Sequence, residues 1–167
     1  MKIVVSPPQK LQVGQAMPYP IVIDTEFGAY DWIQLFPAGE RNLPSRLLCG
    51  SLAESLISLG DQTSTSSLPR SYAIFHNIAF TSRGKFRILI TGMTMDYQSP
   101  GAECVMGEQI HTEQIEVIEE VVKPHQLSKE EQTLLTKIAQ FQDVDVHEEA
   151  PNQDESLDGK ITVAGGS

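Results

Sequence analysis

Residues 85–91 read Lys-Phe-Arg-Ile-Leu-Ile-Thr and carry the clearest strand pattern in the chain. Successive side chains of a β-strand point to opposite faces, so every second residue of this stretch shares a face. One face is therefore expected in a core and the other outside it. The apolar face comprises Phe86, Ile88 and Ile90, and the opposite face comprises Lys85, Arg87 and Leu89.

Other short apolar runs flank this strand and predict a β-sandwich or barrel, because many short strands with frequent turns are typical of these folds. Pro18 and Pro20 indicate an edge position for the run at 20–24, since proline cannot donate to a ladder. Ser82-Arg83-Gly84 indicates a hairpin turn between the run at 71–80 and the strand at 85–91. The predicted strands cover residues 3–5, 20–24, 32–36, 71–80, 85–91 and 114–122.

The leucines between residues 47 and 59 suit either a helix or a strand, and the local pattern leaves both open. Ser128 followed by Glu131 forms a capping box, which predicts one amphipathic helix over about 129–142. Its apolar stripe is expected to lie against the sheet, and it is also the candidate surface for a partner. The stripe consists of Leu134, Leu135, Ile138 and Phe141.

The chain of 167 residues and 18.4 kDa has the size of one domain, and its charge is uneven. Residues 1–100 carry eight basic and seven acidic side chains, a balance of +1. Residues 101–167 carry four and fifteen, a balance of −11, so the net charge is −10. Residues 148–167 are acidic without apolar periodicity, which predicts a disordered tail after a sandwich domain over residues 1–147.

Several classes of protein are excluded by what the sequence lacks. It has no apolar run long enough to span a membrane, and its opening run is too short for a signal peptide. Cys49 and Cys104 cannot build a disulfide scaffold, so a reducing compartment fits best. No glycine-rich phosphate loop, nucleophile elbow or zinc motif is present. We therefore expect no enzyme activity, no cofactor and no metal.

One basic cluster is the candidate site for DNA or another phosphate. Lys85 and Arg87 share a strand face, about 7 Å apart along it, and Arg83 lies just before them. Lys10 and Arg70 are further candidate members. The alternative interpretation is the ordinary solvated outer face of a sandwich, which we favour because three charges are few for phosphate-driven binding.

Four segments in order resemble the velvet family, and together they span about residues 46–146. Residues 48–59 (LCGSLAESLISL) are similar to its pattern L-x-G-x-L-x-x-S-L-x-x-L. Residues 72–80 (YAIFHNIAF) resemble F-V-F-x-D-L-S-V, and residues 83–90 (RGKFRILI) resemble E-G-x-[FY]-R-L-x-F. Residues 127–139 resemble the closing helix of the family.

The velvet resemblance implies a fungal nuclear regulator that couples development and sporulation to secondary metabolism. It implies an immunoglobulin-like, Rel-like β-sandwich that pairs with a velvet partner or with itself, located in the nucleus or cytoplasm. Several family members bind DNA, and no enzymatic activity is implied.

The chain departs from the family where velvet proteins contact DNA. The basic opening loop corresponds here to residues 7–20, in which Lys10 is the only charged residue. The usually basic last strand corresponds to residues 144–148, which are acidic. We therefore expect protein–protein association first and direct, sequence-specific DNA binding as the alternative. A third alternative is a module for a small ligand or sugar, with Tyr30, Trp32 and Tyr97 lining the site.

Overall fold

The computed structural model describes residues 1–39, 42–59 and 69–148, and the side chains of these up to residue 142. The described part of the chain forms eleven strands followed by one helix. In chain order these are β1 (Lys2–Val5), β2 (Lys10–Gln12), β3 (Ile21–Glu26), β4 (Trp32–Gly39), β5 (Leu48–Cys49), β6 (Ala53–Ser55), β7 (Arg70–Phe75), β8 (Ala79–Phe80), β9 (Gly84–Asp96), β10 (Glu103–His111), β11 (Ile115–Ile118) and α1 (Lys129–Glu148).

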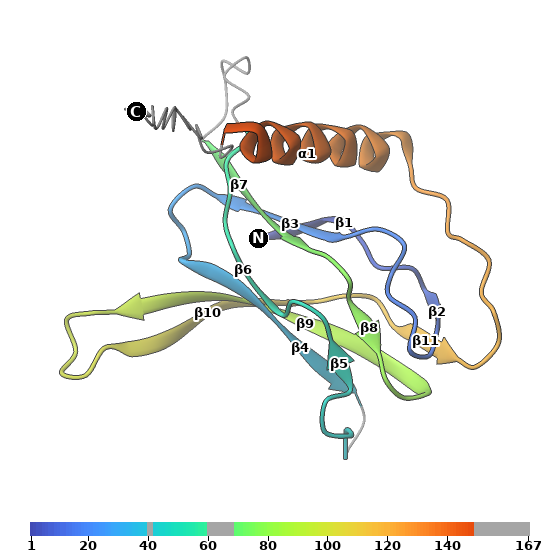
Figure 1. Cartoon of the computed structure of the whole chain (residues 1–167). Coiled ribbons are helices and arrows are strands. Elements are labelled where there is room, and N and C mark those ends of the chain that lie inside the picture. Colours follow the sequence, from blue (N-terminus) through green and yellow to red (C-terminus); the bar gives the residue numbers. More distant parts are fainter. Residues whose placement is uncertain (40–41, 60–68, 149–167) are drawn as a thin grey trace, which may run out of the picture.

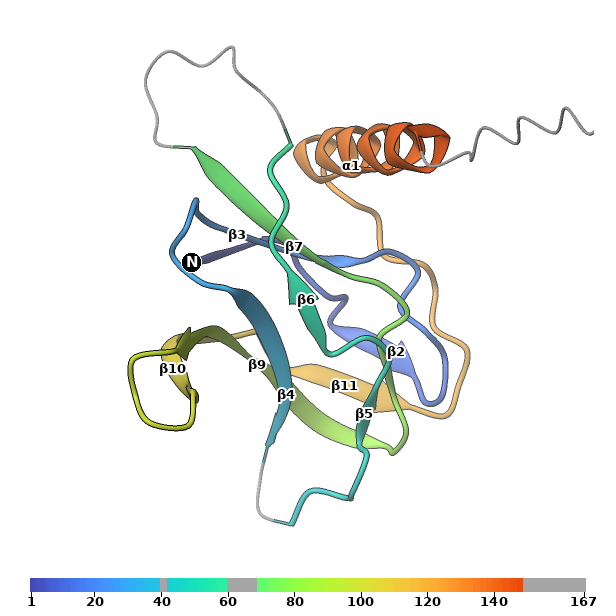
Figure 2. The same ribbon diagram turned by 60° about the vertical axis from the view of Figure 1, so that its left-hand side comes forward.

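Two sheets pack face to face, and the helix lies outside the smaller one (Figures 1 and 2). The smaller sheet has the antiparallel order β1-β3-β7. The larger sheet has the order β2-β11-β9-β4-β6, with β10 paired to β9 as well, and β5 pairs only with β8. The predicted class, an all-β sandwich with one helix near the C-terminal end, is confirmed.

The alternation predicted for residues 85–91 holds within β9. Phe86, Ile88 and Ile90 are buried in the core between the sheets, whereas Lys85 and Arg87 are exposed. Residues of β3 and β7 face them across the same core. β9 is the central strand, since β4 pairs along one side of it and β10 and β11 pair along the other.

The edge position predicted for residues 20–24 is wrong. β3 lies between β1 and β7, and Pro18 and Pro20 precede the strand instead of opening an edge. The hairpin predicted at Ser82-Arg83-Gly84 is also wrong, because β7 and β9 belong to different sheets. The predicted strand at 71–80 divides into β7 and β8, and Asn77 in the connection has a φ of 57°.

β4 continues through Pro37 to Gly39, beyond the predicted end of this strand at residue 36. Ile88, the β9 residue paired with Pro37, directs both of its backbone groups to Thr112 on its other side. Ile88 N donates to Thr112 Oγ1 at 2.9 Å, and Ile88 O accepts from Thr112 N at 3.0 Å. Pro37 and Ile88 therefore form a pair without hydrogen bonds between them, in which each residue directs its backbone groups away from the other. Pro37 consequently needs no N–H at this position of β4. The proline is therefore accommodated inside a paired strand.

The segment at 47–59 forms the strands β5 and β6, which decides between the two open interpretations. The predicted capping box is present, since Ser128 N donates to Glu131 Oε2 at 2.8 Å and Glu131 N donates to Ser128 Oγ at 3.2 Å. The helix runs six residues beyond the predicted end at 142 and includes Glu148, the first residue of the predicted tail. Residues 149–167 lie outside the described residues.

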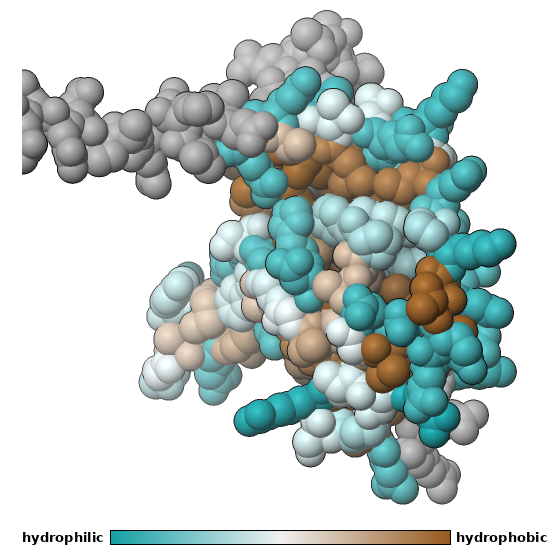
Figure 3. Space-filling view, turned by 45° about the vertical axis from the view of Figure 1, so that its right-hand side comes forward, coloured by the Kyte–Doolittle hydropathy of each residue, from teal (hydrophilic) through white to brown (hydrophobic). Residues whose placement is uncertain are grey.

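The helix packs by one face onto the outer side of the smaller sheet. Ile138 is 2% exposed and contacts a cluster that contains Val5, Val22 and Ile74. Figure 3 shows a hydrophobic band where the helix meets the sandwich, with hydrophilic side chains above and below it. The outer side of the smaller sheet is therefore covered, as the stripe predicted.

Candidate interaction surface on the β9–β10 arm

β9 and β10 continue beyond the rest of the larger sheet as a two-stranded projection. Met93 is the last residue of β9 that pairs with β4, and the strand runs on to Asp96. We call residues 94–106 the arm. It extends away from the body of the sandwich in Figure 1.

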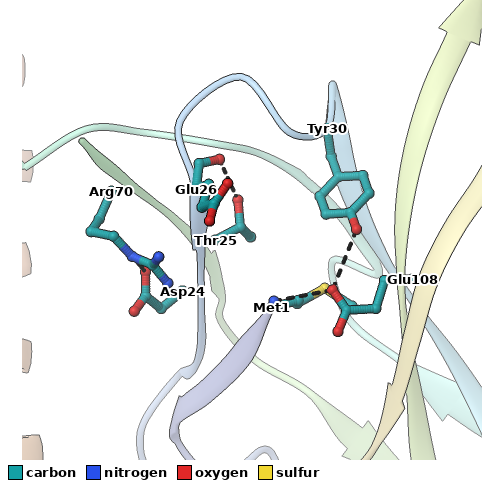
Figure 4. A network of polar contacts seen from close by, with 7 residues as sticks. All are labelled: Met1, Asp24, Thr25, Glu26, Tyr30, Arg70 and Glu108. Carbon is teal, nitrogen blue, oxygen red and sulfur yellow. Dashed lines mark hydrogen bonds and ion pairs between the residues drawn. The ribbon is translucent and has the colours of Figure 1, made fainter. Parts of the chain in front are cut away.

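Tyr30 packs on the base of the arm, over two glycines on neighbouring strands. A Cβ placed on Gly92 would collide with the Tyr30 ring, and one on Gly107 would lie 2.6 Å from it. The Tyr30 hydroxyl donates to Glu108 Oε2 at 3.4 Å, and the amino group of Met1 binds the same oxygen at 3.1 Å (Figure 4). The ring thus fits only because neither glycine has a side chain.

A β-bulge also lies at the base of the arm, next to Gly107. The β9–β10 register shifts between Met106 and Gln109, so one more residue is present on β10 than on β9. Residues 103–106 beyond the bulge pair regularly with β9. The arm therefore has one short, regular stretch of β10 beyond an irregular base.

The two edges of the arm differ. On the β9 edge, Asp31 N donates to Met93 O at 2.8 Å, and Met95 N donates to Asp31 Oδ2 at 2.7 Å. On the β10 edge, no strand pairs and no backbone hydrogen bond arrives from any described residue. One edge is capped and the other presents unpaired backbone groups.

The open edge carries exposed apolar side chains in an acidic setting. Val105 is 48% exposed and Met106 is 61% exposed. Residues 88–122 contain seven acidic side chains and neither lysine nor arginine, and Asp96 and Glu103 lie on the arm itself. Sequence reasoning missed β10, because both of its faces are exposed and no apolar alternation marks it.

The predicted basic residues are brought together only in part. Lys10 and Lys85 both lie opposite Glu116 of β11, one on each side, and Arg87 follows on the same exposed face. Arg83 pairs with Glu119, with 3.3 Å between Nε and Oε1. Glu116 therefore lies between two of these cations, and Glu119 lies beside a third.

Arg70 lies in the other sheet, away from these cations. Its Nε contacts Asp24 Oδ1 at 2.8 Å (Figure 4). The hydrogen bond to this carboxylate raises the pKa of the Arg70 guanidinium. Arg70 does not join the candidate phosphate site.

The predicted partner stripe of α1 faces the smaller sheet. Ile138 is buried there, and Leu134 and Leu135 are half-buried and pack against the same cluster. Phe141 is half-buried. The structure thus places this stripe at a contact within the chain.

Tyr19 lies in that cluster, near the start of the helix. Its hydroxyl is buried and has no hydrogen-bond partner among the described residues. Burial, and secondly the carboxylate of Glu131, raises the pKa of Tyr19 to about 12. The ring of His125 lies 6.3 Å from the Tyr19 ring, measured between centroids.

The aromatic residues predicted for a ligand site do not meet. Tyr30 covers the base of the arm, and Tyr97 is exposed near its tip. Trp32 lies on β4, where its Nε1 donates to Gln34 Oε1 at 3.2 Å. A groove of about 410 Å³ lies elsewhere, and its lining includes none of the three. It is lined by Pro8, Gln9, Lys10, Ile118, Val121, Val122, Lys123 and His125.

Among the described residues, no three His, Cys, Asp or Glu side chains lie close enough to hold a metal ion. Cys49 and Cys104 are free thiols. In the same part of the chain, no helix has the length and apolar character needed to cross a membrane.

Fold and arm together define a class: an all-β sandwich whose β9–β10 arm presents the unpaired edge of β10. No protein-family model matches the chain, and no curated protein matches its sequence.

Proposed function

We propose that the chain is a non-enzymatic regulatory protein that works through protein–protein association. The observation that carries this proposal is the open edge of β10, flanked by exposed Val105 and Met106. Proteins usually protect sheet edges, because unpaired backbone groups recruit another strand. Here Asp31 protects one edge of the arm, and the other remains available.

The resemblance to velvet regulators supplies the finer proposal. The chain would form a dimer with a velvet partner or with itself, and act in the nucleus or cytoplasm on transcription of development and secondary-metabolism genes. An immunoglobulin-like, Rel-like strand arrangement belongs to the same proposal. Two packed sheets of mostly antiparallel strands support it.

Association is favoured over direct DNA binding by the surroundings of the cations. Glu116 lies between Lys10 and Lys85 on neighbouring strands, and Glu119 pairs with Arg83. Phosphate binding would require these carboxylates to be displaced or neutralised. A partner subunit would bring the DNA-binding charge.

Co-purification at physiological salt tests the proposal. The tagged full chain is expressed in a fungal host and recovered under native conditions, and bound proteins are quantified by mass spectrometry. We expect a velvet-family protein, or a second copy of the chain, in near-stoichiometric amount. A chain recovered alone and monomeric by light scattering would contradict the proposal.

A further inference from the structure

We propose that the open edge of β10 binds an extended, basic segment of a partner protein as an added β-strand. This inference rests on the proposed association function and names the chemistry of the partner. It starts from the backbone groups that the arm leaves unpaired.

The pairing register shows which groups these are. Met93 and Met95 direct their backbone groups toward Asp31, on the side of β9 away from β10. In an antiparallel ladder, the β10 residues opposite Met93 and Met95 must direct their own backbone groups away from β9, toward the free edge of β10. Those residues are Met106 and Cys104. Their N–H and C=O groups therefore line the open edge.

An incoming strand would pair with four regular residues, 103–106, before it meets the bulge at the base of the arm. This short contact requires help from side chains. Val105 and Met106 offer apolar surface that an added strand would cover. Edge pairing gives such complexes their affinity, and the alternating side chains give them specificity.

Charge selects the occupant. Glu103 lies on the docking stretch and Asp96 lies opposite it on β9. No lysine or arginine occurs between residues 88 and 122 to offset them. Opposite charges on directly facing residues of neighbouring strands stabilise pairing, and like charges destabilise it. A strand with lysine or arginine at alternate positions complements this edge.

A second copy of the chain fits less well. Antiparallel self-pairing would bring Glu103 and Asp96 of two copies into one narrow sheet, in a protein of net charge −10. A nucleic acid fits less well still, because its phosphates would face the same carboxylates.

The probe for the experiment is a blocked octapeptide with lysine at alternate positions, Lys-Val-Lys-Val-Lys-Val-Lys-Val, added to the isotope-labelled full chain. Its binding is followed by amide NMR and by hydrogen exchange. We expect saturable shifts at residues 103–106 and at least about tenfold slower exchange of the Cys104 and Met106 amides. The same peptide with glutamate for lysine, and one N-methylated at alternate residues, should not bind.

Two variants locate the contact. Met106→Pro removes an outward N–H and keeps the bonds to β9, while Glu103→Lys reverses a charge and leaves the backbone intact. Each should weaken peptide binding at least about tenfold, a loss of about 1.4 kcal/mol or more. Gln98→Lys is the control, since it adds a positive charge near the arm tip but off β10, and it should weaken binding less than about threefold.

Several outcomes would overturn the inference. These are unchanged affinity in both variants, equal binding of the glutamate peptide, or shifts confined to the groove around Lys10 and Lys123. If the free chain forms dimers and the Met106→Pro variant does not, the edge binds a second copy of the chain instead.

The result is separable from that of the proposed function. If a co-purified partner binds Met106→Pro and Glu103→Lys as tightly as the unaltered chain, this inference fails and the association function stands. If the peptide binds at β10 but the chain is recovered alone from its host, the proposed function fails by itself.

Discussion

Tyr30 and the two glycines beneath it decide how the arm joins the sandwich. We predict that Gly92→Ala destabilises the protein by about 1–3 kcal/mol, because the added methyl group must displace a packed ring. Urea denaturation measures the change. Tyr30→Phe is the control, since it keeps the ring and removes only the 3.4 Å hydrogen bond to Glu108. A fully stable Gly92→Ala would contradict this close packing of the ring.

Tyr19 leads to a second prediction at the residue scale. Its hydroxyl is buried without a partner among the described residues, so Tyr19→Phe should leave stability unchanged or raise it by up to about 1 kcal/mol. Urea denaturation at neutral pH checks this. A clear loss of stability would show that the hydroxyl is hydrogen-bonded.

The pKa of Tyr19, raised to about 12, adds a pH dependence. The unfolded chain loses this proton near pH 10, whereas the folded chain keeps it. Stability should therefore be complete below pH 10 and fall as the pH rises from about 10 to 12. Tyr19→Phe should remove this part of the alkaline loss, as denaturation midpoints across that range would show.

Local patterns could identify which residues of a strand are buried, but not contacts made at a distance. The alternation around Ile88 predicted its burial correctly. Nothing near Gly92 or Gly107 in the sequence points to Tyr30, which lies more than sixty positions before them. Such pairings depend on the register of three strands.

At the scale of elements, the apolar stripe of the helix was predictable from the sequence. Whether this stripe packs on the sheet or binds a partner was not. We predict that Ile138→Ala costs about 2–4 kcal/mol, because this side chain alone on the described helix face is almost fully buried. Gln140→Ala, at an exposed position two residues on, should change stability by less than about 0.5 kcal/mol. Thermal and urea unfolding of both variants provide the measurement.

If Ile138→Ala folds with normal stability but loses a co-purified partner, the stripe is an interface and the helix does not pack on the smaller sheet. This outcome separates the two roles that the sequence left open for Leu134, Leu135, Ile138 and Phe141.

The strands show why turn signals alone mislead. Ser82-Arg83-Gly84 has the composition of a hairpin, yet it connects strands of different sheets. Turn residues report a change of direction and carry no information about the pairing partner. β10 was not predicted for another reason. A strand that is exposed on both faces needs no apolar alternation, so nothing in the sequence indicated this strand or its candidate docking edge.

At the scale of the whole molecule, we predict weak DNA binding by the isolated chain. Three cations, Arg83, Lys85 and Arg87, allow a salt slope no steeper than about −2.7 and an affinity in the non-specific range of about 10⁻⁴ to 10⁻⁶ M. Fluorescence anisotropy on duplex DNA at two salt concentrations measures both quantities. Nanomolar, sequence-dependent binding would contradict the association proposal, and charge reversal of the three residues would then be expected to abolish it.

The central place of β9 also determines the order in which the sandwich can form. Its partner β4 precedes it by about fifty residues, whereas β10 follows after six residues, and β2 joins the sheet only through β11, with Lys10 paired to Glu116. Loops of this length must close before the larger sheet gains its contacts, so folding in milliseconds to seconds is expected. On the ribosome, β1, β3 and β7 can pair early, while β2 can join the larger sheet only after β11 has emerged. A nascent chain stalled before that point would lack Ile115 and Val117 in the core between the sheets, and would depend on chaperones to stay soluble.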